Sequence, residues 1–397
     1  MKRPMGAEPA DRDPMLDAPV QSIAGDDPGK KPEQGTALCL SGGGYRAMLF
    51  HLGALWRLYE TDRLKSIKRI SSVSGGSITA GVLGLNWHKL SFDSAKIQTD
   101  FVPQVVAPIR ELASETIDRD ATILGLALPG RVSDQVAASY DRHLFHGAKL
   151  NELPSEPTLV LNATNVQSGA LWRFTKSYMR DYRVGEVKDP QIPLALAVAA
   201  SSAFPPVLSP VEMRLDPNKF TPNSGQDLQR KPFTSRVFLT DGGVYDNLGL
   251  ETAWKRYDTV LVSDGGGKIQ PEDEPKSDWA QHSYRVLNLV DNQVRSLRKR
   301  QLIESYKAPP TEANFRKGAY WGIRSDIADY KLANTLPCPL DRTMELAETP
   351  TRLKRLDDER QERLINWGYA VCDAALRAHV DPGLPRADKF PYPAMKV

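Results

Sequence analysis

The stretch Ser72-Val73-Ser74-Gly75-Gly76 carries most of the information about the fold of this chain. It closes a short strand-like segment at residues 67–73 and opens a helix of small residues at 77–85. A serine on such a tight turn from strand to helix projects its hydroxyl out of the backbone, and the glycines beside it leave room for a substrate carbonyl. The stretch therefore predicts an α/β fold with Ser74 as a candidate nucleophile.

The turn departs from the pattern Gly-x-Ser-x-Gly at its first position, where Ser72 replaces glycine. Clusters of serine and glycine also mark ordinary turns, so the pentapeptide alone does not establish a catalytic role. We expect the turn to tolerate Ser72 if the φ angle of this residue is negative.

A glycine-rich turn lies one strand-helix-strand unit upstream. The apolar residues 37–40 lead into Ser41-Gly42-Gly43-Gly44-Tyr45-Arg46-Ala47, and a helical pattern follows over 48–59. Uncovered N–H groups at a helix N-terminus can hold a phosphate or the oxyanion of a tetrahedral acyl intermediate. The segment lacks the Gly-Lys-Ser/Thr ending of a P-loop and the spaced glycines of a dinucleotide site. Because a parallel sheet brings both turns to the same edge, we expect the oxyanion role.

An acidic residue follows a third buried strand, at residues 236–240. Asp241 stands at the carboxyl end of this strand and is followed by Gly242 and Gly243. A serine hydroxyl is a poor nucleophile until a neighbouring group takes its proton, and an aspartate within hydrogen-bond reach can do this without a histidine. The three turns together predict a serine hydrolase that uses a Ser-Asp pair.

In this order the three motifs resemble the patatin-like phospholipase family, which has a Ser-Asp catalytic dyad, a glycine-rich oxyanion loop and an Asp-Gly-Gly/Ala motif. The resemblance extends to residues 157–164, which are similar to the central strand of the family, and to 200–206, which are similar to the end of its small-residue helix. It covers residues 35–270. It implies a three-layer α/β/α sandwich with a mostly parallel central sheet and helical insertions.

The resemblance also implies roles for individual residues. Ser74 would be the nucleophile and Asp241 its base, and the N–H groups of Gly42, Gly43 and Gly44 would form the oxyanion hole. Supporting roles would fall to Arg46, Gly76, Gly242 and Gly243. Ala47 stands where the family commonly has glycine. Neither a metal ion nor an organic cofactor is implied.

Other polar residues near these motifs have structural interpretations. Asp246 is placed to cap a helix N-terminus, and Asp264 begins a strand-end turn near the site. A Ser-His-Asp triad would need a histidine downstream of the acid, which leaves His282 and His379. We prefer structural roles for both histidines, and the triad stays as an alternative.

Composition restricts the class of protein. The chain has 397 residues, of which 41% are hydrophobic, enough for one large buried core. Its 52 basic and 49 acidic residues give a net charge of +3 and no reason to expect a nucleic acid partner. Three widely spaced cysteines favour a reducing, cytoplasmic location. No stretch approaches the roughly 18 apolar residues of a spanning helix, so we expect peripheral contact with the membrane.

We expect a flexible arm at 1–34, without the apolar segment of a signal peptide, and one α/β hydrolase domain at 35–397. A helical insertion at about 90–150, broken at 128–130, either caps the site or faces solvent. Residues 208–233 are predicted to form a loop.

A C-terminal extension at about 280–397 contains predicted helices at 283–305 and 350–378, the second capped by Thr349, and a strand at 319–324. The basic cluster Arg295, Arg298, Lys299 and Arg300 fits a solvated helix face better than a lipid-binding surface.

The leading hypothesis is a serine lipid acyl hydrolase of the phospholipase A type, which cleaves glycerophospholipid esters through an acyl-enzyme. The alternatives are a general esterase or thioesterase on the same dyad, and a non-catalytic patatin fold that senses a ligand. The presence of Ser74, Asp241 and the three glycines disfavours the last hypothesis. The partner would be a phospholipid or another acyl ester, and the sequence leaves the head group, the sn position and the oligomeric state open.

Overall fold

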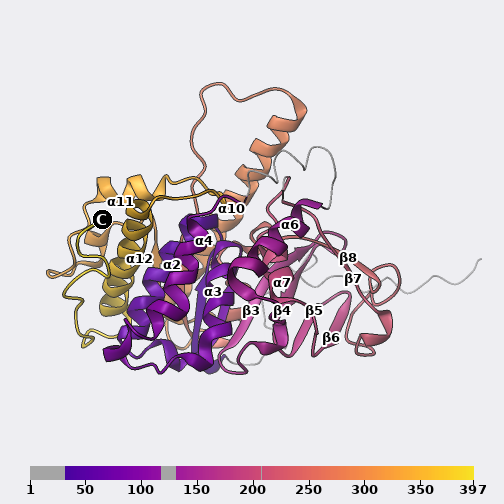
Figure 1. Ribbon diagram of the computed structural model, residues 1–397, viewed down its shortest axis with the longest axis horizontal. Helices are drawn as coiled ribbons and strands as arrows, with labels where there is room; N and C mark the ends of the chain where they lie inside the picture. Colours follow the sequence, from indigo (N-terminus) through magenta and orange to yellow (C-terminus); the bar gives the residue numbers. More distant parts are fainter. Residues whose placement is uncertain (1–31, 118–130, 207) are drawn as a thin grey trace, which may run out of the picture.

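The computed structural model describes residues 32–117, 131–206 and 208–397 (Figure 1). Within these residues one sheet contains the strands β1 (Glu33–Leu40), β2 (Ile67–Ser72), β3 (Thr158–Asn165), β4 (Ala170–Phe174), β5 (Tyr178–Asp181), β6 (Gly185–Lys188), β7 (Val211–Arg214), β8 (Arg236–Asp241), β9 (Tyr257–Asp264) and β10 (Lys317–Gly322). The α-helices are α2 (Gly44–Glu60), α3 (Gly75–Asn86), α4 (Ala107–Ala113), α6 (Arg131–Tyr140), α7 (Leu194–Ser201), α8 (Gly243–Asp246), α9 (Glu251–Trp254), α10 (Trp279–Lys307), α11 (Leu340–Ala347) and α12 (Asp358–His379).

The sheet is parallel in one half and antiparallel in the other. Its order is β10-β9-β1-β2-β3-β4-β5-β6, with all pairings from β10 to β3 parallel and all pairings from β3 to β6 antiparallel. Strand β8 pairs antiparallel with both β3 and β7. The α/β fold class is confirmed, but the sheet is mixed rather than mostly parallel. The connections that join β3, β4, β5 and β6 in order are too short for crossovers and form hairpins instead.

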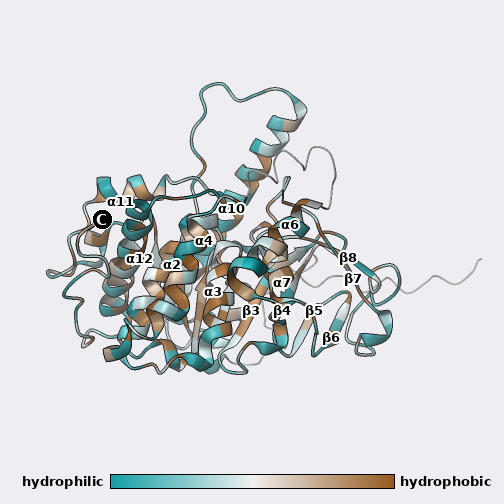
Figure 2. Cartoon of the chain, in the orientation of Figure 1, coloured by the Kyte–Doolittle hydropathy of each residue, from teal (hydrophilic) through white to brown (hydrophobic). Residues whose placement is uncertain are grey.

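Side chains alternate between the two faces of the sheet, and helices cover both faces. On β1, Leu38 and Leu40 belong to the large core under α2, α3 and α12, whereas Ala37 and Cys39 belong to a smaller core that includes Leu302 of α10. Figure 2 shows that the hydrophobic residues concentrate on the elements inside the molecule. The predicted three layers are therefore present.

The closing helix begins later than the sequence predicts. Helix α12 starts at Asp358, and the side chain of Asp357 caps it by accepting a hydrogen bond of 2.7 Å from the N–H of Arg360. The segment before it lies against the glycine-rich turn instead, since the N–H of Tyr45 donates to the carbonyl of Arg352 at 3.1 Å. The predicted cap at Thr349 is wrong because this non-local contact, which a local pattern cannot show, holds the segment out of the helix.

Three other expectations need adjustment. The insertion is helical, with α4, α6 and two π-helical turns, but its predicted break at 128–130 lies outside the described residues. The predicted loop at 208–233 contains β7, which is a strand because it pairs with β8. Glu33 and Gln34, assigned to the arm, belong to β1, whereas residues 1–31 lie outside the described part of the chain.

The basic cluster on α10 faces the body of the protein more than it faces solvent. Arg295 forms an ion pair with Asp264 at 3.1 Å, and Arg298 forms one with Glu251 at 2.9 Å. The predicted solvated face is therefore wrong for these two arginines, because carboxylates from β9 and α9 lie opposite them. Among the helices that the structure describes, none is long and apolar enough to cross a membrane.

Candidate active site

Ser74 stands on a strained turn between β2 and α3. Its φ and ψ angles are 52° and −121°, a region that residues other than glycine seldom adopt. The backbone N–H of Ser74 is held by Ser201 of α7, at 3.2 Å from the carbonyl and 3.1 Å from the hydroxyl oxygen. The structure therefore has the strand-turn-helix geometry that the sequence predicts, and α7 holds the strained residue in place.

The glycines that follow Ser74 are required by close backbone contacts. A Cβ atom added at Gly75 would lie 2.2 Å from the carbonyl oxygen of Gly44, and one added at Gly76 would lie 2.4 Å from that of Leu40. Ser72, at the first position of the turn, is not among the residues with positive φ. It ends β2 as an ordinary strand residue, which confirms the condition under which the turn tolerates it.

Asp241 approaches Ser74 from the opposite direction. Strand β2 runs parallel to β3 and ends with Ser72 opposite Leu161, whereas β8 runs antiparallel to β3 and ends with Asp241 opposite Ala163. The ends of β2 and β8 therefore meet head to head along β3. This arrangement places the carboxylate beside the turn that carries the serine hydroxyl.

The carboxyl group of Asp241 is buried, and burial raises its pKa to about 7. Hydrogen bonds from the N–H of Gly243, at 2.7 Å, and from the hydroxyl of Ser74 act in the opposite direction. The charge of Asp291 on α10 raises the pKa further. A base with a pKa near neutrality is suited to taking a proton from serine at neutral pH.

Gly242 and Gly243 fit a crowded turn after Asp241. A Cβ atom at Gly242 would lie 2.3 Å from the carbonyl oxygen of Asn162, and one at Gly243 would lie 2.6 Å from Nδ2 of Asn247. A side chain at either position would therefore collide with the neighbouring residues, and a supporting role for these glycines stays a prediction.

The three predicted oxyanion donors are not equivalent. The N–H of Gly42 donates to the carbonyl of Asn247, directly after α8, at 3.0 Å, so this predicted donor already has an acceptor in the structure. Gly43 and Gly44 have φ angles of 147° and 60°, and their N–H groups have no acceptor among the described residues. The same holds for the N–H of Gly75, directly after the candidate nucleophile Ser74. Gly43, Gly44 and Gly75 are the donors left beside the turn.

Arg46 fastens the glycine-rich loop. Its Nε donates to the carbonyl of Gly265 at 3.0 Å, its Nη2 donates to the hydroxyl of Thr351 at 2.8 Å, and its Nη1 donates to the carbonyl of Thr349. Burial, together with two nearby arginines, lowers its pKa to about 9. Arg46 is therefore a positioning residue that ties the loop to the end of β9 and to the segment before α12.

His51 is a supporting residue that the sequence alone did not indicate. Its Nε2 lies 2.9 Å from the carbonyl of Ser41 and its Nδ1 lies 2.8 Å from the hydroxyl of Ser263. Burial lowers the pKa of His51 to about 4, so the ring is neutral at physiological pH and links the glycine-rich loop to β9. In the sequence His51 lies inside a helical pattern, and no local motif distinguishes it from an ordinary residue of the hydrophobic core.

Ser201 is a second such residue, and here a signal existed. Besides holding the N–H of Ser74, its hydroxyl donates to the carbonyl of Asn162 at 2.6 Å. Its neighbour Ser202 lies 3.2 Å from the hydroxyl of Tyr140, which belongs to the helical insertion. The motif at 200–206 marked this helix end, but only the fold shows that it holds the backbone of Ser74.

The competing acids and histidines have other contacts. Asp246 is not the N-cap residue of α9, which is Leu250, but its carboxylate accepts a hydrogen bond of 2.7 Å from the N–H of Glu251, the first residue of that helix. Burial acts to raise the pKa of Asp264. The charge of Arg295 and hydrogen bonds from Tyr320, Gly266 and Arg295 nevertheless hold this pKa below its usual value. Within the described residues, neither His282 on the exposed part of α10 nor His379 at the end of α12 forms a hydrogen bond with Asp241. These contacts favour the dyad over the triad.

The sequence model of the patatin-like phospholipase family matches residues 38–254, a range that includes all three turns and more than half of the chain. The chain belongs to this family. A comparison with curated protein sequences gave no match.

The chain is similar to several solved structures. Human GIVD cytosolic phospholipase A2 is 14% identical with a TM-score of 0.51, and the match covers 87% of this chain and 61% of the human chain. The chain thus spans about three fifths of that enzyme's length, and the likeness shows the fold alone. VipD from Legionella pneumophila is 15% identical with a TM-score of 0.32, covering 88% and 75% of the two chains. The type III effector ExoU, known from Pseudomonas aeruginosa, is 12% identical with a TM-score of 0.30, covering 88% and 54%.

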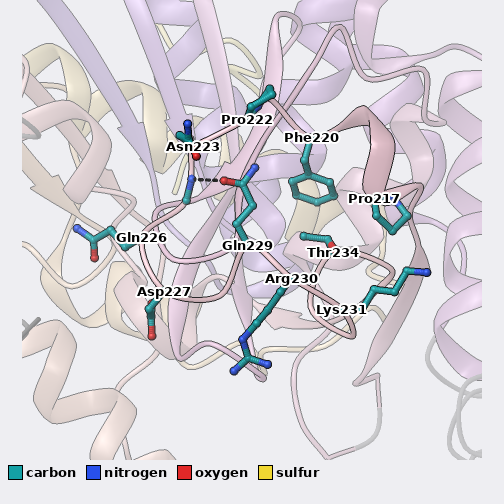
Figure 3. Close-up of a pocket in the computed structure, with 11 residues that line it drawn as sticks. Pro217, Phe220, Pro222, Asn223, Gln226, Asp227, Gln229, Arg230, Lys231 and Thr234 are labelled. Atoms are coloured by element: carbon teal, nitrogen blue, oxygen red, sulfur yellow. Dashed lines mark hydrogen bonds between the residues drawn. The ribbon is translucent and has the colours of Figure 1, made fainter. Parts of the chain in front are cut away.

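A cavity of about 590 Å³ is lined by residues of the segment 217–234, outside the three glycine-containing turns (Figure 3). Phe220 and Arg230 are among its lining residues, and the N–H of Gly225 donates to Oε1 of Gln229 at 3.0 Å beside it. Neither Ser74 nor Asp241 lines this cavity, so we do not assign it to catalysis.

We expect Gly43→Ala to lower turnover at least about 100-fold, because one donor of the candidate oxyanion hole is displaced. The added Cβ would lie 2.8 Å from the carbonyl oxygen of Gly265, so a loss of thermal stability is expected as well. Gly169→Ala is the matched control, since Gly169 also has a positive φ of 71° but no atom within 4 Å of the added Cβ. The rate of hydrolysis of a soluble ester measures the loss of turnover, and the melting temperature measures the loss of stability. Equal turnover in both variants would contradict the assignment.

Proposed function

We propose that this patatin-like chain is a serine lipid acyl hydrolase of the phospholipase A type, acting through a Ser-Asp dyad and an acyl-enzyme. The observation that carries the proposal is the meeting of β2 and β8 along β3, which brings the hydroxyl of Ser74 to the buried carboxyl of Asp241. Membership of the family supports a lipid ester as substrate. A cytoplasmic location and peripheral membrane contact remain predictions.

The proposed reaction begins when Asp241 takes the proton of Ser74 and the serine oxygen attacks the ester carbonyl. The N–H groups of Gly43 and Gly44 donate hydrogen bonds to the oxyanion that forms. The carbonyl re-forms, the bond to the glycerol oxygen breaks, and the proton passes from Asp241 to this leaving oxygen. Asp241 then takes a proton from water as the water oxygen attacks the acyl carbonyl. The bond to the serine oxygen breaks, Asp241 returns the proton to Ser74, and the fatty acid is released.

The purified chain tests this proposal when it is incubated with phosphatidylcholine and the products are identified by mass spectrometry. We expect equal amounts of fatty acid and lysophospholipid. Faster turnover of soluble esters or thioesters, with no lysophospholipid, would favour the general esterase or thioesterase. Absence of turnover on all of these substrates, without covalent labelling of Ser74, would favour the ligand-sensing alternative.

The proposed base predicts how the rate depends on pH. Because Asp241 must be ionised to accept the proton and its pKa is about 7, kcat/KM for a soluble ester is expected to rise with pH and level off above about pH 8. Asp291→Asn removes a charge that raises this pKa, so the rise is expected at lower pH in that variant. Profiles of both proteins check the prediction. A rate that is flat through pH 7 would contradict Asp241 as the base.

A further inference from the structure

The first half of α10 has little covering it. Of the 29 residues of α10 only Leu302 and Ser305, near the C-terminal end, are buried. Figure 1 shows the N-terminal half projecting away from the body of the molecule, together with the loop before it. The helix is held by its second half, through Arg295 on Asp264, Arg298 on Glu251 and the hydroxyl of Tyr306, which donates to the carbonyl of Val260 at 2.7 Å.

An apolar stripe runs along the outside of this helix. Trp279, Val286, Val290 and Leu297 are 84%, 44%, 51% and 56% exposed. Their intervals of seven, four and seven residues return to one side of a helix with about 3.6 residues per turn. The side that faces the body carries the charged residues Asp291, Arg295 and Arg298 instead. The stripe, defined by these four residues, is therefore a separate face without a partner in the described structure.

The helix that carries the stripe lies next to the edge of the sheet that carries the candidate site. Arg295 donates to the carbonyl groups of Gly266 and Gly267, which directly follow Gly265, the residue bonded to Arg46 of the glycine-rich loop. Asp291 acts electrostatically on Asp241. An enzyme that takes its substrate from a lipid surface needs an apolar contact at this edge, and the stripe is in a position to supply it.

The charges around the stripe agree with a lipid surface. On α10 the exposed Arg300 lies near Leu297, whereas Lys299 lies over the ring of Tyr320, 4.3 Å from its centroid, on the side that faces the body. The single acid between Trp279 and Ile303, Asp291, is largely buried. Lipid phosphates attract cations such as Arg300, and tryptophan is favoured at the boundary between lipid and water. The preceding segment carries the acids Glu272, Asp273, Glu274 and Asp278, the last directly beside Trp279, so apolar insertion should contribute more than charge attraction.

We propose that the stripe on α10 docks on a phospholipid bilayer and holds the active-site edge at the lipid surface. This inference rests on the proposed lipid substrate, but binding can be measured without turnover. The stripe buries itself among acyl chains and head groups, while Arg300 approaches the phosphates. A second copy of the chain is the competing occupant of the same face.

The test uses the full chain with Ser74→Ala, so that vesicles stay intact, and measures cosedimentation with two kinds of vesicle. One kind contains phosphatidylcholine alone, and in the other phosphatidylglycerol replaces about one lipid in five. We expect binding to both, somewhat stronger with phosphatidylglycerol. Replacing all four stripe residues by serine should weaken binding at least about 100-fold. Val166→Ser with Met395→Ser is the matched control, since these exposed apolar residues lie outside α10 and should leave binding unchanged.

The same stripe substitutions in the chain with native Ser74 should keep hydrolysis of a soluble ester and reduce hydrolysis of vesicle phospholipid. Retained hydrolysis of the soluble ester also shows that the fourfold variant folds. If the fourfold variant does not fold, the single variant Trp279→Ser is used for the same measurements. Unchanged vesicle binding by the stripe variant would overturn the inference. So would a dimer in light scattering that the stripe substitutions convert to monomer. If the chain binds vesicles but hydrolyses no lipid, the proposed function fails while the docking surface stands.

Discussion

Ser74→Ala is expected to lower ester hydrolysis at least about 10,000-fold, because the nucleophilic oxygen is removed and only binding and oxyanion stabilisation remain. The melting temperature should change little, since the hydrogen bonds to Ser201 use the backbone of Ser74 rather than its side chain. Hydrolysis of a soluble ester and of phosphatidylcholine, together with a thermal melt, checks both expectations.

Ser72→Ala is the control for this variant. It removes a hydroxyl from the same turn, where the oxygen lies 3.0 Å from that of Ser77 and takes no part in the proposed reaction. Most of the activity should remain. If Ser74→Ala retained substantial turnover, another residue would have to be the nucleophile.

Asp241→Asn is expected to lower turnover at least about 1,000-fold, because asparagine keeps the acceptor for the N–H of Gly243 but cannot take the proton of Ser74. Whereas turnover falls, the free energy of unfolding of the variant should stay the same or rise. The pKa of Asp241 is about 7 in the folded chain and about 3.9 in the unfolded chain, so its contribution to stability is present at low pH and is lost as the pH rises through 7. Thermal melts at about pH 8 should therefore show the variant to be as stable as the native chain or more stable.

His282→Gln and His379→Gln are the controls for the base. Neither histidine has a hydrogen bond to Asp241 in the described structure, so both variants should keep most of the activity. A loss in either one as large as that in Asp241→Asn would replace the dyad by a triad.

The sequence was sufficient where a function depends on a local turn. Glycines that follow a buried strand and precede a helix predicted the turns around Ser74 and Gly43, and the structure has both. The small-residue requirement at Gly75 and Gly76 comes from a distant segment, since the carbonyl oxygens of Gly44 and Leu40 lie within 2.4 Å of the added Cβ positions, but the glycines themselves mark it in the sequence. Such turns depend on backbone angles and close contacts, which residue type reports directly.

The sequence was insufficient where pairing between distant segments decides the result. The antiparallel approach of β8 to β3, the contact of Gly42 with Asn247 and the packing of Arg352 against Tyr45 all join segments far apart in the chain. The same holds for Arg295, which a local charge pattern places in solvent and the fold places on Asp264. No periodicity within one segment carries this information.

The most direct test of the Ser-Asp dyad is the rate at which an alkyl fluorophosphonate labels the chain, measured against pH and read by mass spectrometry of the labelled peptide. Our account predicts one adduct, on Ser74, with a rate that rises through about pH 7 and collapses in Asp241→Asn. An adduct on another serine, or a labelling rate on Ser74 that is the same in native protein and Asp241→Asn, would contradict it.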